Sequence, residues 1–137
     1  MNRLAIDGAS AGNPGPSGVG ILIVYEDGQT DEHRYHIGIK NNHEAEFEAL
    51  VIALSLAKNK QLSHLFIQTD SKLVSEAVEK GYVKRKQFEP YLAKAQRLLD
   101  SFELFFIKWV PSKQNKKADE LARLAIREPK RTFKELL

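Results

Sequence analysis

The chain has 137 residues, a length that fits one compact domain with a substantial buried core, so residues 1–137 are interpreted as a single domain. Its 42% hydrophobic and 28% charged residues are typical of a globular protein, and the lack of cysteine excludes disulfides, zinc–thiolate sites and thiol catalysis and suits the cytoplasm. The net charge of +3 hides an acidic front (five Lys/Arg against eight Asp/Glu in residues 1–60) and a basic end (nine against four in residues 108–137). This asymmetry predicts a polyanionic partner and a separate cation site, although a solvated charged C-terminal helix explains it equally well.

The first 40 residues are expected to form an antiparallel meander of three strands. Leu4–Ile6 leads into a glycine- and proline-rich loop over residues 8–18, and Gly18–Tyr25 is the second strand. Asp27-Gly28 is a hairpin turn signal, and His33–Ile39 alternates in polarity as a third strand. The apolar run of the second strand is far too short to cross a bilayer, and the N-terminal residues show no secretory signal.

From about residue 43 the pattern changes to alternating helices and strands. The expected elements are a helix over His43–Lys58, a strand over Leu65–Thr69, a helix from Ser71 to Lys80 ended by Gly81, a basic connection over Tyr82–Gln87, a helix over Glu89–Ser101, a strand over Leu104–Val110, a loop over Pro111–Gln114, a helix over Asn115–Arg127 and a short basic tail from about residue 128. A meander followed by this alternation predicts an α/β domain with a mixed sheet covered by helices.

Two aspartates occupy matching places after apolar strands. Asp7 follows Leu4–Ile6, and Asp70 follows Leu65–Thr69 and precedes Ser71 at a helix start. A carboxylate at a strand end can face a cleft and serve a site there. Each also has an ordinary structural explanation, because aspartate starts turns and caps helices.

Glu46 lies on the apolar side of its predicted helix. At 100° per residue the polar side chains gather on one narrow face, formed by Glu44, Glu48, Ser55 and Lys58. Glu46 points nearly the opposite way, where a lone carboxylate loses hydration at a high cost unless a cation or donors replace the water. Glu46 therefore needs a partner, which is a bound cation, a Lys or Arg, or solvent at an open helix end.

Asp119 lies at the edge of the apolar arc of the last predicted helix, whereas Glu120 falls on the outer basic face with Arg123 and Arg127. Asp119 can therefore reach a cleft. Four carboxylates do not gather for stability, because like charges repel. If they converge, their hard oxygen ligands suit Mg²⁺, and two ions roughly 3.5–4 Å apart can activate water and stabilise the leaving oxygen of a phosphodiester. Spacing alone does not establish convergence.

Four segments resemble, in order, the motifs of the type 1 ribonuclease H family. AIDGASAGNPGPSGVGILI resembles the opening strand and loop of the family, and NHEAEFEAL its first-helix motif. IQTDSKLV resembles the second-aspartate motif, and WVPSKQNKKADELARLA the last loop and helix. The resemblance covers essentially the whole chain. It implies the ribonuclease H-like fold, an α/β fold with a mixed five-stranded sheet (a three-stranded antiparallel meander plus parallel strands) flanked by helices.

The resemblance also implies an activity and its residues. The implied catalytic and metal-binding set is Asp7, Glu46, Asp70 and Asp119. These residues are implied to use two Mg²⁺ ions, with Mn²⁺ as a substitute, for water attack on the RNA strand of an RNA–DNA hybrid, leaving 5′-phosphate and 3′-hydroxyl ends. The implied minor-groove contacts, which sense ribose 2′-hydroxyls, are Gly12, Asn13, Pro14, Gly15, Asn42 and His43. Ser71 is a weaker candidate for a contact to a DNA-strand phosphate.

Two features depart from well-known family members. Many members carry a histidine in the loop before the last aspartate, whereas this loop reads VPSKQNKK, which leaves Lys113 or Asn115 as candidates for that role. Bacterial members also have a long basic protrusion, and only Lys84-Arg85-Lys86 occupies that stretch here, which predicts lower or more salt-sensitive affinity. The chain therefore resembles the shorter, histidine-lacking, reverse-transcriptase-like members.

Several alternatives remain at this stage. A lone histidine beside a helix start, such as His43, is more often a cap or surface residue than a ligand. Trp109 and Phe105-Phe106 are predicted to be core rather than base-stacking residues. The leading hypothesis is a monomeric hybrid-specific endoribonuclease without an obligate protein partner, and its alternative is a nucleic-acid-binding module with weak or no catalysis. Strand transfer or exonuclease activity on the same fold ranks last.

Overall fold

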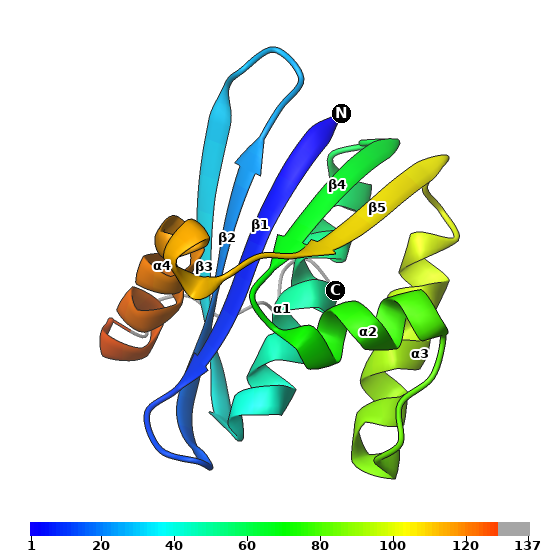
Figure 1. The fold of residues 1–137 in the computed structure, drawn as a ribbon. Coiled ribbons are helices and arrows are strands. Elements are labelled where there is room, and N and C mark those ends of the chain that lie inside the picture. Colours follow the sequence, from blue (N-terminus) through cyan, green and yellow to red (C-terminus); the bar gives the residue numbers. More distant parts are fainter. Residues whose placement is uncertain (129–137) are drawn as a thin grey trace.

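The computed structural model describes residues 1–128 and consists of one five-stranded mixed sheet with helices on both faces (Figure 1). The strand order is β3-β2-β1-β4-β5. The strands span Asn2–Ser10 (β1), Gly15–Val24 (β2), Thr30–Lys40 (β3), His64–Thr69 (β4) and Leu104–Trp109 (β5). β1, β2 and β3 are antiparallel neighbours, whereas β4 is parallel to β1 and β5 is parallel to β4. The predicted fold class is therefore confirmed; the predicted tail beyond residue 128 lies outside the described residues.

Four α-helices flank this sheet. They span Asn42–Asn59 (α1), Lys72–Lys80 (α2), Glu89–Leu99 (α3) and Lys116–Arg127 (α4), with short 3₁₀ turns at Lys86–Phe88 and Ser112–Gln114. α1 packs on β1 and β2 and is backed by α3, while α4 packs on β1, β2 and β3 from the other side (Figure 1). Within residues 1–128, no helix is both long enough and apolar enough to cross a membrane.

Local sequence signals set the helix ends. Asn41 caps α1 through a capping box, in which its side chain accepts from the Glu44 N–H and the Glu44 side chain accepts from the Asn41 N–H. Ser71 caps α2, and Gly81 ends it in the left-handed conformation with φ 78°. The predicted start and stop of this helix are thereby confirmed.

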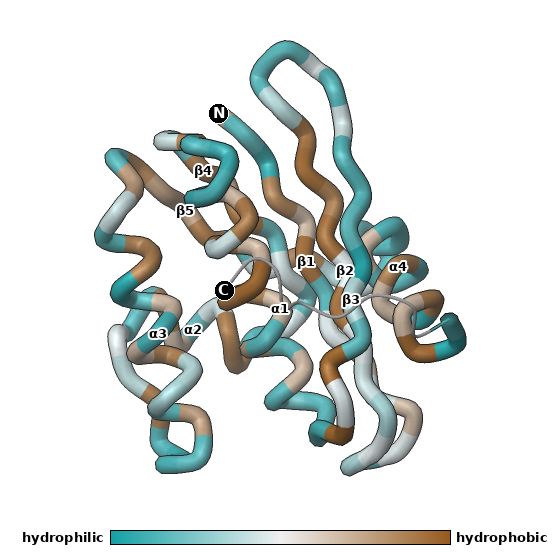
Figure 2. The backbone as a smooth tube through the Cα atoms, turned by 180° about the vertical axis from the view of Figure 1, so that it is seen from behind, coloured by the Kyte–Doolittle hydropathy of each residue, from teal (hydrophilic) through white to brown (hydrophobic). Residues whose placement is uncertain are grey.

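The core lies between the sheet and α1. Ten residues of α1 are buried, because this helix is enclosed by β1 and β2 on one side and by α3 on the other. The most hydrophobic stretches of the backbone follow the central strands, whereas the β2–β3 hairpin end is hydrophilic (Figure 2). α1, the helix nearest the centre, therefore has little exposed surface, so its polar residues are not gathered on one broad face.

Two glycines let helices touch the sheet backbone directly. A Cβ on Gly8 would lie 2.1 Å from the Ala45 carbonyl oxygen in α1, and a Cβ on Gly20 would lie 2.2 Å from the Ala118 carbonyl oxygen in α4. Real side chains do not tolerate such contacts, so both positions require glycine unless the backbone moves. The first turns of α1 and α4 are thus drawn close to β1 and β2.

Two predictions about the strands are corrected. The loop expected over residues 8–18 is reduced to residues 11–14, because residues 8–10 continue β1 and pair with β2, so Asp7 lies inside β1 rather than at its end. Phe105, Phe106 and Trp109 are not core residues: they are 37%, 53% and 38% exposed. β5 is the edge strand of the sheet, and α4 packs on β1, β2 and β3 instead. Because successive side chains of a strand point to opposite faces, Phe106 lies on one face and Phe105 and Trp109 on the other, so both faces of β5 are partly open.

Candidate active site

A hollow of about 640 Å³ brings together all four predicted carboxylates. Asp7 comes from β1, Glu46 from α1, Asp70 from the turn between β4 and α2, and Asp119 from α4. The remaining lining residues are Gly8, Ala9, Ser10, Ala11, Asn42, His43, Ser112, Arg123, Ile126 and Arg127. Side chains from four separate elements thus converge at one place, which spacing in the sequence could not establish.

The sheet register places the two aspartates side by side. β1 and β4 are parallel neighbours in which Ile6 pairs with Thr69, so the residues that follow, Asp7 within β1 and Asp70 just after β4, lie side by side. Asn115, at the start of α4, donates its side-chain N–H to the Ile6 carbonyl oxygen at 2.8 Å. The start of α4 is therefore attached to the residue immediately before Asp7.

Among the residues that line the hollow, the buried Asp7 has the pKa that is shifted furthest from its ordinary value. Its side chain is largely removed from water, and burial together with the neighbouring Asp70 and Asp119 raises the pKa of Asp7 to about 9. Burial also raises the pKa of Glu46, although hydrogen bonds from His43 and Ser71 oppose this shift. At neutral pH the cation-free hollow therefore retains a proton that a bound cation would displace.

Two of the four carboxylates are turned toward cationic or donor groups of the protein. Arg123 Nε lies 3.1 and 3.0 Å from the two carboxylate oxygens of Asp119, and His43 Nδ1 lies 3.0 Å from Glu46 Oε1. As the side chains are placed, no three His, Asp or Glu residues within residues 1–128 form a ready-made ligand set. The donor chemistry, carboxylate oxygens around a buried Asp7 whose pKa is raised, nevertheless fits a hard divalent cation.

Comparisons with known proteins identify the family. The sequence pattern of the family described as "Reverse transcriptase-like" matches residues 5–125. EbsB of Enterococcus faecalis is 41% identical over 128 residues, which cover 92% of this chain and 94% of EbsB. The crystal structure of RNase H1 from Halobacterium salinarum matches with a TM-score of 0.88 and 32% identity, covering 93% of this chain and 98% of that chain. This chain belongs to the type 1 ribonuclease H family.

A second solved structure of the family is that of LC11-RNase H1 in complex with an RNA/DNA hybrid. It matches this chain with a TM-score of 0.84 and 30% identity, covering 93% of this chain and 98% of that chain. The shared fold extends over nearly the full length of both proteins.

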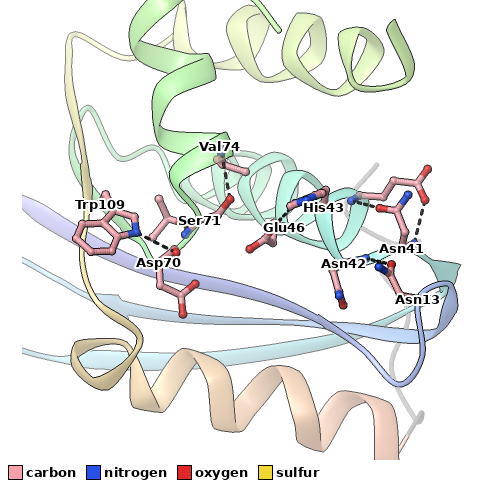
Figure 3. Close-up of polar contacts among 11 residues, drawn as sticks. Asn13, Asn41, Asn42, His43, Glu46, Asp70, Ser71, Val74 and Trp109 are labelled. Atoms are coloured by element: carbon pink, nitrogen blue, oxygen red, sulfur yellow. Dashed lines mark hydrogen bonds and ion pairs between the residues drawn. The ribbon is translucent and has the colours of Figure 1, made fainter. Parts of the chain in front are cut away.

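The residues predicted to touch the minor groove divide into two groups. Asn42 and His43 line the hollow, and the Asn42 backbone N–H donates to Asn13 Oδ1 at 3.0 Å, so the loop over residues 11–14 is attached to the start of α1 (Figure 3). Gly12, Pro14 and Gly15 belong to this loop region but lie outside the lining of the hollow. Asn13 and Asn42 thus form a bridge at the rim.

Ser71 has a different environment from the other predicted contacts. It is 4% exposed, and its hydroxyl accepts from the Val74 N–H at 3.1 Å (Figure 3). This bond caps α2 directly after Asp70. As placed, the Ser71 hydroxyl fixes the turn that carries Asp70 and interacts with Glu46, rather than facing open solvent.

Trp109 supports Asp70 from the neighbouring strand. Its indole Nε1 donates to the Asp70 carbonyl oxygen at 3.0 Å (Figure 3). The Lys72 ammonium lies 4.8 Å from the centroid of the indole ring. The exposed indole therefore serves the turn between β4 and α2. This contact explains a partly exposed tryptophan on an edge strand better than the predicted core role does.

The two auxiliary candidates in the loop before Asp119 lie in different environments. Lys113 is exposed in the 3₁₀ turn Ser112–Gln114, whose first residue lines the hollow. Asn115 is 3% exposed, and its amide is engaged with the Ile6 carbonyl oxygen. Of the two candidates, Lys113 is the one exposed to solvent and therefore suits the auxiliary role better. Asn115 instead holds α4 on β1.

Sequence reasoning missed that two arginines, Arg123 and Arg127, line the hollow. It placed Arg123 on the outer face with Glu120, whereas Arg123 pairs with Asp119 and Glu120 pairs with Lys117 at 3.6 Å. An i, i+4 spacing puts two residues one helical turn apart, so the spacing of Arg123 from Asp119 was the available signal. Ser10, Ser112 and Arg127, which also line the hollow, had no comparable signal.

Proposed function

We propose that this protein cuts the RNA strand of RNA–DNA hybrids internally, leaving 5′-phosphate and 3′-hydroxyl ends. The observation that carries the proposal is the convergence of four carboxylates in one hollow, where the pKa of Asp7 rises to about 9. Without cations, the burial and mutual repulsion of these carboxylates destabilise the fold. Bound divalent cations offset that repulsion and can support phosphodiester hydrolysis. The complex of LC11-RNase H1 with an RNA/DNA hybrid supports the substrate class, because that protein shares this fold.

The proposed cofactors are two Mg²⁺ ions, for which Mn²⁺ can substitute. Asp7, Glu46, Asp70 and Asp119 supply the carboxylate oxygens that hold them, and Asp7 gives up its proton in doing so. Bound divalent cations supply an activated water and stabilise the leaving oxygen of a phosphodiester. The contribution of the chain is to hold the ligands in a fixed hollow and to shield Asp7 from water.

The proposed substrate contacts follow the walls of the hollow. Arg123 and Arg127 bring guanidinium groups to the edge of the carboxylate cluster, where they match phosphate oxygens of the RNA strand. The bridged pair Asn13 and Asn42 stands at the rim, where amide groups can bond ribose 2′-hydroxyls and so separate RNA from DNA. Lys113 is proposed to replace the family histidine in assisting product release or water placement.

The alternative function is a nucleic-acid-binding module with little catalysis. It is favoured by the histidine-lacking loop and by the short basic segment Lys84-Arg85-Lys86. A pure binder, however, gains nothing from a buried Asp7 beside two further carboxylates. A monomeric state and a cytoplasmic location remain predictions of the sequence.

The proposal is tested by a cleavage assay on end-labelled RNA–DNA hybrid, RNA–RNA duplex and single-stranded RNA. Each is incubated with Mg²⁺, Mn²⁺ or chelator, and the protein is compared with Asp70→Asn. We expect cation-dependent cutting of the hybrid alone, lost in the variant. Retained hybrid binding without cutting under any cation would instead establish the binding module, and cutting of single-stranded RNA would refute the proposed substrate class.

A further inference from the structure

His43 occupies a place in the hollow that neither the carboxylates nor the minor-groove contacts explain. Its Nδ1 lies 3.0 Å from Glu46 Oε1, three residues along α1. The Glu46 side chain is 20% exposed and that of His43 is 52% exposed. Figure 3 shows Glu46 between His43 and the turn formed by Asp70 and Ser71. An ionised carboxylate can only accept, so with Glu46 ionised the proton of this hydrogen bond is on Nδ1.

The half-exposed imidazole ring is anchored to the core by one aromatic contact. The rings of His43 and Phe88 pack in a T-shaped pair with their centroids 6.0 Å apart. Phe88 is 1% exposed and stacks on Phe47 of α1 at 5.3 Å. An exposed i, i+3 ion pair is ordinarily weak, because two mobile side chains must be ordered to form it. Here the packing of the His43 ring against Phe88 already restricts the imidazole, so less side-chain motion is lost when the contact with Glu46 forms.

Among the four carboxylates, Glu46 depends most on a second residue to fix the orientation of its side chain. Asp7 lies within β1 and Asp70 directly follows β4, and both have short side chains, whereas Glu46 has one more rotatable bond and projects from a helix. His43 engages Oε1 but not the second oxygen of Glu46, so the imidazole leaves that oxygen unoccupied, while the Ser71 hydroxyl also interacts with this carboxylate. Groups that orient metal ligands in this way change metal affinity or activity by roughly 10- to 100-fold when they are removed.

We propose that His43 is a positioning residue for the metal ligand Glu46: its Nδ1–H fixes one carboxylate oxygen and leaves the other for a divalent cation. This inference rests on the proposed function of the hollow. It assigns His43 a role through Glu46, which differs from a direct contact of its outer nitrogen, Nε2, with the substrate.

The test exploits two replacements that imitate different nitrogens of histidine. The amide nitrogen of His43→Asn stands near the place of Nδ1, whereas that of His43→Gln reaches the place of Nε2. His43→Ala removes both, and His64→Ala is the matched control, because His64 Nε2 makes a similar contact to Glu103 (3.1 Å) at the opposite end of β4. Mn²⁺ affinity is measured by calorimetry without substrate, and kcat and KM are measured on a hybrid with saturating Mn²⁺ and with Mn²⁺ near its Kd.

We expect His43→Ala to weaken Mn²⁺ binding by roughly 10-fold or more and to lower kcat at limiting Mn²⁺, with KM for the hybrid little changed. His43→Asn should restore most of both losses, and His64→Ala should match the wild type. Unchanged Mn²⁺ affinity in His43→Ala would overturn the proposal. A rise in KM alone that His43→Gln restores would also overturn it, in favour of direct substrate contact.

The same experiment separates failure of this inference from failure of the proposed function. A wild-type protein that binds Mn²⁺ but does not cut the hybrid refutes the proposed function. Weaker Mn²⁺ binding by His43→Ala in that inactive protein would still support the role of His43. Active wild-type protein with an unaltered His43→Ala variant refutes only the role of His43.

Discussion

Replacement of Asp7 by asparagine is expected to stabilise the cation-free protein while abolishing cleavage. The carboxyl group of Asp7 has its pKa raised from 3.8 to about 9 by burial and by Asp70 and Asp119. Below about pH 3.8 the group is protonated in both the folded and the unfolded chain. Between that pH and about 9 the folded state holds a proton that the unfolded state has lost, so the free energy of unfolding falls as the pH rises.

The size of the effect follows from this pH window. Each pH unit above 3.8 costs the folded state about 1.4 kcal/mol, so the penalty at pH 7 reaches at most about 4 kcal/mol. Asp7→Asn removes it, since the amide does not titrate. At about 4 °C per kcal/mol for a domain of this size, the melting temperature of the variant rises by up to about 15 °C.

The assay is thermal unfolding followed by circular dichroism in chelator and in Mg²⁺, from pH 5 to 8. In chelator the gap between Asp7→Asn and the wild type should widen as the pH rises. In Mg²⁺ the gap should narrow, because binding to the folded wild type contributes about 2.7 kcal/mol at a concentration 100 times Kd. Asp27→Asn, in the exposed β2–β3 hairpin, is the matched control and should follow the wild type.

Two results would refute this reasoning. One is a variant that melts below the wild type in chelator at pH 7, which would mean that Asp7 is ionised and stabilised by donors. The other is a gap that stays constant from pH 5 to 8, which would place the titration of Asp7 outside this window.

Three further predictions concern the surroundings of the carboxylates. Glu46→Gln should abolish cation-dependent cleavage, whereas Glu48→Gln, which loses only a 3.7 Å ion pair with Lys40, should be nearly silent in the same assay. Gly20→Ala should lower the free energy of unfolding by roughly 1–3 kcal/mol, measured in urea, because its Cβ forces α4 away from β2. Trp109→Phe should lower kcat but leave hybrid affinity unchanged, since it removes the indole N–H from the Asp70 carbonyl oxygen.

Each of these has a result that contradicts it. Equal losses in the two glutamine variants would show that the hollow does not distinguish Glu46 from Glu48. A Gly20→Ala protein as stable as the wild type would mean that α4 can shift freely. A Trp109→Phe enzyme with unchanged kcat would show that the turn carrying Asp70 is fixed by Ser71 alone.

The elements of the fold were largely predictable because their signals are local. The α2 boundaries depend on a serine cap and on Gly81, both of which act within one helical turn. The β2–β3 turn depends on Asp27-Gly28 in the same way. The loop before Gly18 was not predictable at its true length, because residues 8–10 join β1 only through pairing with a strand that follows.

The candidate site was predictable in part. The matching positions of Asp7 and Asp70 after apolar strands anticipated their adjacency, which the parallel register of β1 and β4 provides. The helical-face argument selected Glu46 for an incomplete reason, because the Glu46 and Glu48 side chains are similarly exposed, at 20% and 25%. Glu46 differs because it lies near the start of α1, where the helix meets the hollow.

The exposure of β5 could not be predicted from its composition. An apolar, aromatic strand is ordinarily buried, but β5 is the edge strand of the sheet, and α4 packs over the three strands of the meander rather than over β5. The pairing of Arg123 with Asp119 was accessible from spacing, but its place on the wall of the hollow depends on the docking of α4.

The four carboxylates enter the chain in the order in which it is translated, and the last of them, Asp119, belongs to α4. A nascent chain therefore displays Asp7, Glu46 and Asp70 well before α4 can dock over Gly20 and add the fourth ligand. If all four are required, a ribosome-bound fragment that ends before α4 is inert toward nucleic acid. The nuclease then becomes active only after α4 has been synthesised and has docked on the sheet.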